Sequence, residues 1–138
     1  MREIKFRAFD KEHRIFMEIE SLDMNFIYQN KKHIAVWRKP YKFENSNAIS
    51  HRAKVDKTIL MQYTGLKDKN GIEIYEGDIF IKDYTPHIIE FHNGRYVGTT
   101  GKGYDTRNCV DLDEDLAYII TTIGNIYENK ELLKENNE

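Results

Sequence analysis

Residues 60–80, LMQYTGLKDKNGIEIYEGDIF, hold the pattern that decides the fold. Apolar and polar side chains alternate on both sides of the Asn70-Gly71 pair, as in strands with one buried face. Asn-Gly suits a type I′ hairpin turn, in which both residues take a positive φ. The Gly77-Asp78 pair then precedes an apolar strand, which is typical of the sharp corners of small β-barrels. The stretch therefore predicts two paired strands followed by a corner.

Two further hairpins are predicted on either side of this stretch. Near the N-terminus, the alternating residues 4–8 and 15–19 flank a short polar turn. Further along, the Asn93-Gly94 pair predicts a second type I′ turn. That turn sets a register that pairs His92 with Arg95 and Phe91 with Tyr96 across the two strands. We expect the aromatic pair to lie on the core face.

The C-terminal third of the chain predicts a strand and a short helix. The β-branched residues 118–123 predict the strand, and Asn129 is placed to cap a helix over residues 130–134. Short strands separated by turn signals predict an all-β barrel or pseudo-barrel with one terminal helix. The length predicts a single domain over residues 1–138, with the polar segment 44–57 as a variable or mobile loop.

The composition predicts a cytoplasmic protein. The single cysteine, Cys109, cannot form an internal disulfide, which fits a reducing compartment. The first residues, MREIKFRAFDKEHR, carry charges where a signal peptide needs an apolar run. No stretch is long and apolar enough to span a bilayer, so we expect no membrane contact.

Charge is unevenly distributed along the chain, although the net charge is only −2. Residues 31–57 carry eight Lys or Arg against two acidic residues, a net charge of +6. Residues 104–138 carry nine acidic residues against three basic ones, a net charge of −6. The two segments can each face water, or they can meet within one chain or between two copies.

An aromatic and basic segment inside the positive region suggests nucleic-acid binding. Single-stranded nucleic acid is held by rings that stack on bases and by cations that lie near phosphates. Residues of both kinds are interleaved here: Trp37, Arg38, Lys39, Tyr41 and Lys42. A strong nucleic-acid-binding domain is expected to be basic, however, and this chain is slightly acidic. The alternative is that the aromatic residues enter the core while the cations face water.

The patterns that could signal catalysis or metal binding fail on spacing. Five histidines lie in five different segments, and no pair has metal-ligand spacing. The acidic run at 111–115 lacks the glycine and the closing glutamate of a calcium loop. The glycine-rich residues 98–103 lack the Ser or Thr that follows Gly-Lys in a phosphate loop. We therefore predict no catalytic residue, no metal and no cofactor.

One pair of carboxylates, Glu76 and Asp78, leaves two interpretations open. The residues flank Gly77, so in a strand their side chains would point the same way and could act as acid and base. Alternatively, Asp78 accepts hydrogen bonds from turn amides at a barrel corner. The second interpretation is favoured, because aspartate commonly plays this part in turns.

Three segments taken together resemble the YopX family of phage and prophage proteins. They are REIKFRAFD at residues 2–10, the stretch at 60–80, and IGNIYENKELL at residues 123–133. Phe9 stands where the family often has Trp, and Lys130 stands where it often has Pro. The resemblance implies a small SH3-like pseudo-barrel built from hairpins, with a short C-terminal capping helix. It also implies a gene of a temperate phage of low-GC Gram-positive bacteria, and it implies no activity.

We therefore expect a non-enzymatic phage or prophage accessory protein in the cytoplasm of a bacterial host. Small barrels leave open strand edges, and oligomerisation is a common way to cover them. The expected partners are thus a second copy of the chain and a host or phage protein. The alternative is a nucleic-acid-binding module that uses residues 37–42. An inhibitor of a host enzyme would leave no signature of its own in the sequence.

Overall fold

A computed structural model of the chain describes residues 3–17, 19, 21–22, 33–38, 51–54, 57–101, 105 and 107–133. The chain divides into two compact units. Residues 6–61 form the N-terminal unit, and residues 1–5 together with residues 62–138 form the C-terminal unit. The long strand β6 (Thr58–Lys67) runs through both units. The prediction of a single domain over residues 1–138 stays a prediction.

The N-terminal unit is built from antiparallel strands. Its strands besides β6 are β1 (Phe6–Asp10), β2 (Ile15–Met17), β3 (Ser21–Leu22), β4 (His33–Arg38) and β5 (His51–Lys54). β1 and β2 form the predicted N-terminal hairpin, in which Phe9 lies opposite Phe16. The carboxylate of Asp10 closes the turn, because it accepts hydrogen bonds from the backbone N–H groups of Glu12 and His13. β3, β4 and β5 form a separate three-stranded sheet.

The segment predicted as a variable or mobile loop, 44–57, is described only in part. Residues 51–54 form β5, which pairs with β4. Residues 44–50 and 55–56 lie outside the described residues. The prediction of a loop over 44–57 therefore stays a prediction.

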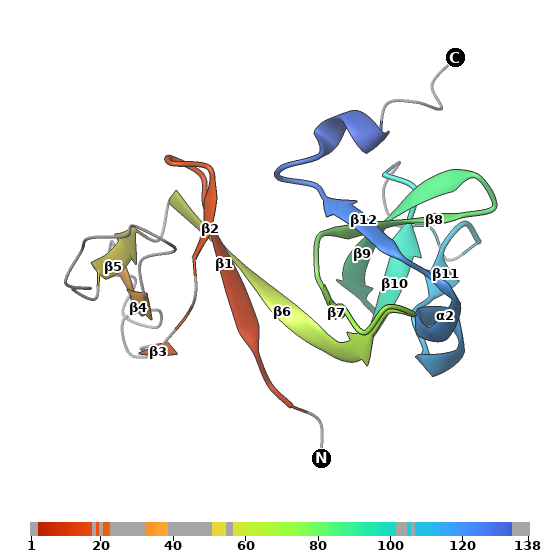
Figure 1. Cartoon of the computed structure of the whole chain (residues 1–138), viewed down its shortest axis with the longest axis horizontal. Helices are drawn as coiled ribbons and strands as arrows, with labels where there is room; N and C mark the ends of the chain where they lie inside the picture. The colour runs from red at the N-terminus through yellow and green to blue at the C-terminus, as the bar shows by residue number, and fades with distance from the viewer. Residues whose placement is uncertain are drawn as a thin grey trace. The chain divides into compact units, whose positions relative to one another are not determined.

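The C-terminal unit contains a five-stranded antiparallel sheet in the order β11-β10-β9-β8-β12. Its elements beyond β6 are β7 (Glu73–Tyr75), β8 (Asp78–Lys82), β9 (Thr85–His92), β10 (Arg95–Thr99), β11 (Val110–Asp111), α2 (Glu114–Ile119), β12 (Thr122–Asn125) and the 3₁₀-helix η2 (Lys130–Leu133). The strands curl, and α2 lies at one end of the sheet (Figure 1). Strand and helix residues share one core: Ile74, Phe80, Ile89, Tyr96, Leu112, Leu116, Ala117 and Ile120. The prediction of an all-β, barrel-like fold with a small helical cap is confirmed.

The helix α2 corrects the prediction of a strand over residues 118–123. Residues 118 and 119 end the helix, and β12 begins only at Thr122. The side chain of Asp113 caps α2 by accepting a hydrogen bond from the backbone N–H of Leu116 at 2.8 Å. This cap, together with burial of Leu116 and Ala117, outweighs the strand preference of the β-branched residues that follow.

The predicted C-terminal helix is present as η2, but Asn129 does not cap it in the way expected. The Asn129 side-chain oxygen accepts a hydrogen bond from the backbone N–H of Asn125 at 3.1 Å, on the preceding turn. A Cβ atom on Gly124 would clash with this same oxygen, so a larger residue there would displace the Asn129 side chain. The motif Gly124-Asn125 to Asn129 is thus a structural turn that precedes η2.

The two Asn-Gly pairs behave differently. Asn93 and Gly94 have φ angles of +53° and +78°, and His92 and Arg95 are paired as predicted. The second type I′ turn is therefore confirmed. The first turn is not of this type, because Asn70 does not have a positive φ whereas Gly71 does. There the carboxylate of Asp68 holds the chain by accepting hydrogen bonds from the turn amides.

The predicted aromatic pair on the second hairpin forms, but only one of its rings is in the core. The ring centroids of Phe91 and Tyr96 lie 5.0 Å apart. Tyr96 is 7% exposed, whereas Phe91 is 51% exposed. The prediction that both rings lie on the core face is wrong for Phe91, which lies next to the hairpin turn.

Candidate functional site

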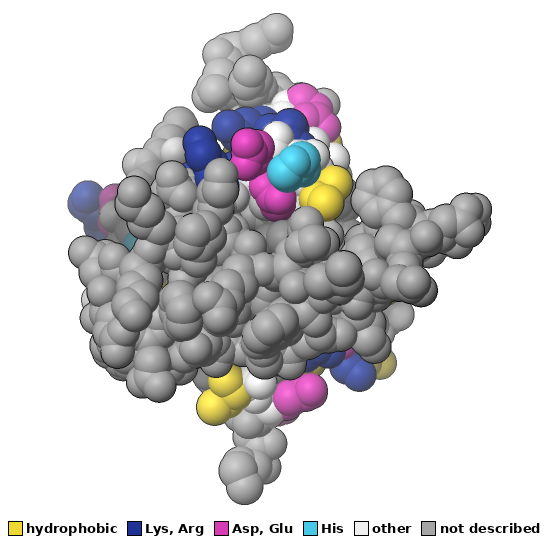
Figure 2. Space-filling view, turned by 90° about the vertical axis from the view of Figure 1, so that its left-hand side faces the viewer, with side chains coloured by type: hydrophobic (Ala, Val, Ile, Leu, Met, Phe, Trp, Pro, Cys, Tyr) yellow, Lys and Arg dark blue, Asp and Glu magenta, His cyan; other side chains and the backbone are white. Residues whose placement is uncertain are grey.

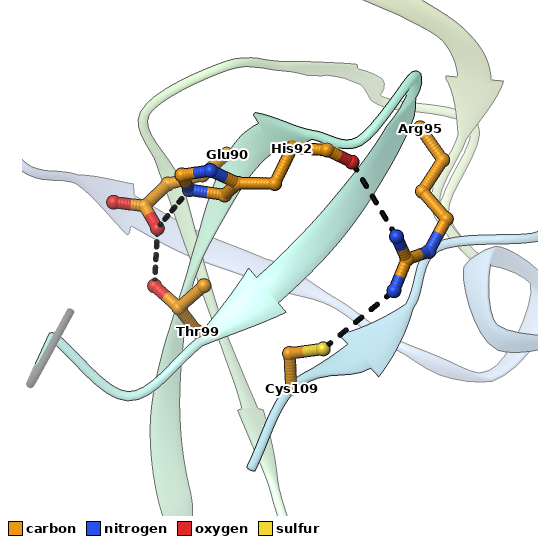
Figure 3. A network of polar contacts seen from close by, with 5 residues as sticks. All are labelled: Glu90, His92, Arg95, Thr99 and Cys109. Atoms are coloured by element: carbon orange, nitrogen blue, oxygen red, sulfur yellow. Dashed lines mark hydrogen bonds and ion pairs between the residues drawn. The ribbon is translucent and has the colours of Figure 1, made fainter. Parts of the chain in front are cut away.

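A network of polar side chains spans β9, β10, β11 and the residue Cys109 just before β11; Figure 3 shows its members other than Asp111. It comprises Glu90, His92, Arg95, Thr99, Cys109 and Asp111, and we call it the β9–β11 network. The two-residue turn at Asn93-Gly94 sets its geometry, because it fixes the register between β9 and β10. Val97 lies opposite Asp111, so β11 joins on the other side of β10.

The carboxylate of Glu90 is the centre of one half of this network. Its Oε2 atom accepts a hydrogen bond of 2.6 Å from the hydroxyl of Thr99 and lies 3.2 Å from Nε2 of His92. Thr99 is 1% exposed, so the hydroxyl is closed off from solvent. In a nucleophilic triad the histidine accepts the proton of the hydroxyl. Here the carboxylate of Glu90 lies between the hydroxyl of Thr99 and the imidazole of His92. This arrangement therefore ties β9 to β10.

The guanidinium of Arg95 is the centre of the other half. Its Nε donates to Oδ1 of Asp111 at 2.6 Å, and its Nη1 donates to the carbonyl oxygen of His92 at 3.5 Å. Nη2 lies 3.9 Å from the sulfur of Cys109. A guanidinium has no proton-accepting atom, so Arg95 cannot act as the general base that a thiol nucleophile needs.

The carboxylates beside Gly77 have the structural role that the sequence favoured. Gly77 has a φ of +84°, and Oδ2 of Asp78 accepts a hydrogen bond from the backbone N–H of Tyr75 at 2.9 Å. Oε1 of Glu76 accepts one from the backbone N–H of Gln62 at 3.0 Å. Asp78 is 5% exposed, so it is closed off from a substrate. These bonds agree with a barrel corner and not with an acid-base pair.

The residues predicted for nucleic-acid binding are only partly described. Trp37 and Arg38 end strand β4, and Lys39, Tyr41 and Lys42 lie outside the described residues. The register of β4 and β5 places Arg38 opposite His51 and His33 opposite Lys54. Residues with basic side chains therefore occupy paired positions of this sheet.

The view in Figure 2 shows one side of the molecule. Its described Lys, Arg, Asp, Glu and His side chains are interspersed, so they form no patch of a single sign there. Within the described ranges, no three His, Cys, Asp or Glu side chains are close enough to hold a metal ion. The described part of the chain also contains no helix with the length and apolar character that crossing a membrane requires.

A group of large apolar side chains in the C-terminal unit is exposed. Large apolar side chains follow one another at the end of α2 and in β12, and one more lies in the turn before β7. We call this set the α2–β12 surface: Ile72 (55% exposed), Tyr118 (79%), Ile119 (66%) and Ile123 (41%). The sequence pattern does not predict this set, because residues 118–123 have the pattern of one strand.

The carboxylate of Asp68 holds the two parts of the α2–β12 surface together. Its Oδ1 accepts hydrogen bonds from the backbone N–H groups of Asn70 and Ile72, at 2.9 and 3.0 Å. Its Oδ2 accepts from the backbone N–H and the hydroxyl of Thr122, both at 3.0 Å. Burial alone would raise the pKa of Asp68, but these hydrogen bonds outweigh it and lower the pKa below its ordinary value. The exposed apolar residues therefore lie on a firmly tied frame.

The curled sheet with its helical cap defines a small, barrel-like, all-β protein. The model of the YopX protein family matches residues 5–134, so the chain belongs to this family. No curated protein matches the chain.

Two solved structures are similar to the chain over nearly its whole length. Protein EF1440 from Enterococcus faecalis is 27% identical; the match covers 97% of this chain and 100% of that one, with a TM-score of 0.62. Protein yopX from Bacillus subtilis is 18% identical; the match covers 97% of this chain and 98% of that one, with a TM-score of 0.55. The second likeness shows the fold alone.

Proposed function

We propose that the protein is a non-enzymatic phage or prophage accessory protein that acts by binding proteins, with a second copy of itself as the first partner. Membership of the YopX family supports the phage origin. The α2–β12 surface is the observation that carries the binding proposal. Fully burying an aliphatic or aromatic side chain contributes about 1.5–3 kcal/mol. A frame that keeps four such side chains exposed is therefore suited to a partner that covers them.

The charge distribution favours a second copy as that partner. Tyr118, Ile119 and Ile123 lie within residues 104–138, the segment with a net charge of −6. Residues 31–57 of a second copy carry +6. Opposite charges steer two surfaces together and hold them in register. The strands β11 and β12 end the five-stranded sheet, and strand edges give copies a further way to associate.

Size-exclusion chromatography with light scattering tests this proposal. We expect an oligomer at low salt that dissociates partly at high salt, because salt screens contacts between exposed charges. Ile119→Ser should shift the protein toward the monomer. Ile4→Ser is the matched control, since Ile4 is 73% exposed but lies outside the α2–β12 surface, and it should leave the oligomer intact. A wild-type monomer at every salt and protein concentration would contradict self-association.

Nucleic-acid binding through residues 37–42 is the second candidate function. The register of β4 and β5 favours it, because the strand that carries Trp37 and Arg38 runs beside Arg52 and Lys54. Contacts with phosphates would make the binding weaken as salt increases.

Fluorescence anisotropy with single- and double-stranded oligonucleotides tests the second candidate. The double variant Arg38→Ala with Lys39→Ala should weaken binding and flatten its salt dependence. The matched control is Lys11→Ala with Arg14→Ala, which removes two exposed cations from the β1–β2 turn of the same unit. No binding at low salt, or equal losses in both double variants, would eliminate this function.

A further inference from the structure

The strand β12 forms one edge of the five-stranded sheet. It is the last strand in the order β11-β10-β9-β8-β12 and pairs with β8 on its inner side. In an antiparallel pair, the N–H and C=O groups of successive residues point alternately toward the partner strand and away from it. Ile126, directly after β12, donates its N–H to the carbonyl oxygen of Gly77, directly before β8. The N–H and C=O of Asn125 therefore point away from β8, toward the outer side of β12.

Asn129 binds both of these outward groups of Asn125. Its side-chain oxygen accepts a hydrogen bond from the backbone N–H of Asn125 at 3.1 Å, and its own backbone N–H donates to the carbonyl oxygen of Asn125 at 2.9 Å. Two residues that face each other in an antiparallel ladder exchange the same pair of hydrogen bonds. Asn129 thus occupies the groups with which a residue of a further strand would pair.

The loop between β6 and β7 covers the other end of the same edge. Oδ2 of Asp68 accepts a hydrogen bond from the backbone N–H of Thr122 at 3.0 Å. The backbone N–H of Lys69 donates to the carbonyl oxygen of Ile120 at 3.1 Å. Asp68 is 5% exposed, so water has little access to its carboxylate. Residues of the same chain therefore bind backbone groups at both ends of β12.

We propose that Asp68 and Asn129 protect the β12 edge against strand addition, so that a strand of another molecule cannot pair with it. An edge with available N–H and C=O groups is a template for such pairing, and native proteins cover these edges with loops and charged side chains. Protection matters here because Ile123 of β12 is 41% exposed, and an apolar edge strand is prone to aggregate. Edge association of copies is then left to β11, at the other end of the sheet. The proposal goes beyond the proposed function, because it applies to a monomer as well as to an oligomer.

Amide hydrogen exchange in the full chain, followed by NMR, tests whether the edge is closed. The amides of Thr122 and Asn125 should exchange slowly in the wild type, although no strand pairs with them. Asn129→Ala should speed exchange at Asn125 by roughly 10-fold relative to Ile126, which is the effect of one lost hydrogen bond, and should leave Thr122 unchanged. Asp68→Ala should give the reverse pattern. Wild-type exchange at Thr122 and Asn125 as fast as in an unfolded chain would overturn the proposal.

Aggregation of the variants tests what the closed edge prevents. Asn129→Ala should form aggregates that bind thioflavin T at concentrations where the wild type forms none, because the opened edge pairs with strands of other copies. Gly98→Ala is the matched control, since its added Cβ atom would meet the ring of Phe80 and strain the core away from β12. It should lower the Tm at least as much without forming these aggregates.

Two results of this comparison would contradict the proposal. Equal aggregation of Asn129→Ala and Gly98→Ala would assign the effect to lost stability, and faster exchange at Asn125 with no aggregation would show that the open edge is harmless. Each variant is compared with the wild type in the oligomeric state that the wild type has. A failure of this proposal is therefore distinct from a failure of self-association.

Discussion

The β9–β11 network and the α2–β12 surface belong to the same unit but use their side chains in opposite ways. In the network, the carboxylate of Glu90 and the guanidinium of Arg95 bind groups of the same chain. On the α2–β12 surface, the apolar side chains are exposed, although their backbone is tied down by Asp68. Polar groups satisfied internally stabilise the fold, whereas exposed apolar groups remain available to a partner.

The largest loss of stability should come from Asp68→Ala, because Asp68 ties the backbone beneath the α2–β12 surface together. The change leaves the N–H groups of Asn70, Ile72 and Thr122 without their carboxylate acceptor. Hydrogen bonds to a charged group contribute about 1.5–3 kcal/mol each, so we expect the free energy of unfolding to fall by about 3 kcal/mol or more. Urea unfolding followed by circular dichroism measures it. Self-association should weaken as well, because Ile72 loses its position.

Asp111→Ala is the matched control for Asp68→Ala. The side chain of Asp111 is 63% exposed, so its removal should change the free energy of unfolding by no more than about 1 kcal/mol. Equal losses in the two variants would mean that Asp68 does not tie the surface together.

The hairpins could be predicted from the sequence because their signals are local. Alternation of apolar residues and the Asn93-Gly94 pair specify the β9–β10 register within ten residues, and the structure has that register. The Asn70-Gly71 pair predicted the wrong type of turn, because the shape of this turn depends on Asp68. Asp68 also binds Thr122, which is 54 residues away in the sequence. No local pattern reports a contact of that range.

The candidate site was harder to predict than the fold. The α2–β12 surface depends on a helix of only six residues, too short to show a clear helical period. A signal was present nonetheless, because Asp113 followed by Glu114 and Asp115 has the composition of a capped first helical turn. The β9–β11 network joins strands that only folding brings together, so spacing along the sequence does not show it.

Gly98→Ala tests the core behind the β9–β11 network, and it should cause the second-largest loss of stability. A Cβ atom on Gly98 would lie 2.6 Å from the ring of Phe80, which is itself fully buried. Overpacking of this kind costs about 1–3 kcal/mol, because the ring has no free space to move into. Thermal unfolding measures the loss. The Tm of Gly101→Ala serves as a comparison, because at Gly101 the added Cβ atom would meet only Ile88, at 3.7 Å, and the cost is confined to its positive φ.

Acid should weaken the two units through one buried aspartate in each. Burial raises the pKa of Asp10 and Asp68, but hydrogen bonds to the ionised forms, including one with His13 at Asp10, outweigh it and lower both values below the ordinary 3.8. Their stabilisation is therefore fully present above pH 3.8 and is lost as the pH falls through the lower folded values. Asp68→Asn should flatten this acid dependence of the unfolding free energy. If the unfolding free energy of Asp68→Asn falls as steeply in acid as that of the wild type, other carboxylates cause the acid dependence.

The smallest loss of stability should come from Arg95→Ala, although Arg95 binds several groups of the β9–β11 network. The Arg95 side chain is 39% exposed and that of Asp111 is 63% exposed, so water screens their ion pair. Exposed pairs of this kind contribute about 0.2–1 kcal/mol. A double-mutant cycle with Asp111→Ala in urea unfolding should give a coupling energy in that range, while the oligomeric state stays that of the wild type. A loss of self-association in Arg95→Ala would break the comparison, because the network would then take part in binding and not only in holding β11 to β10.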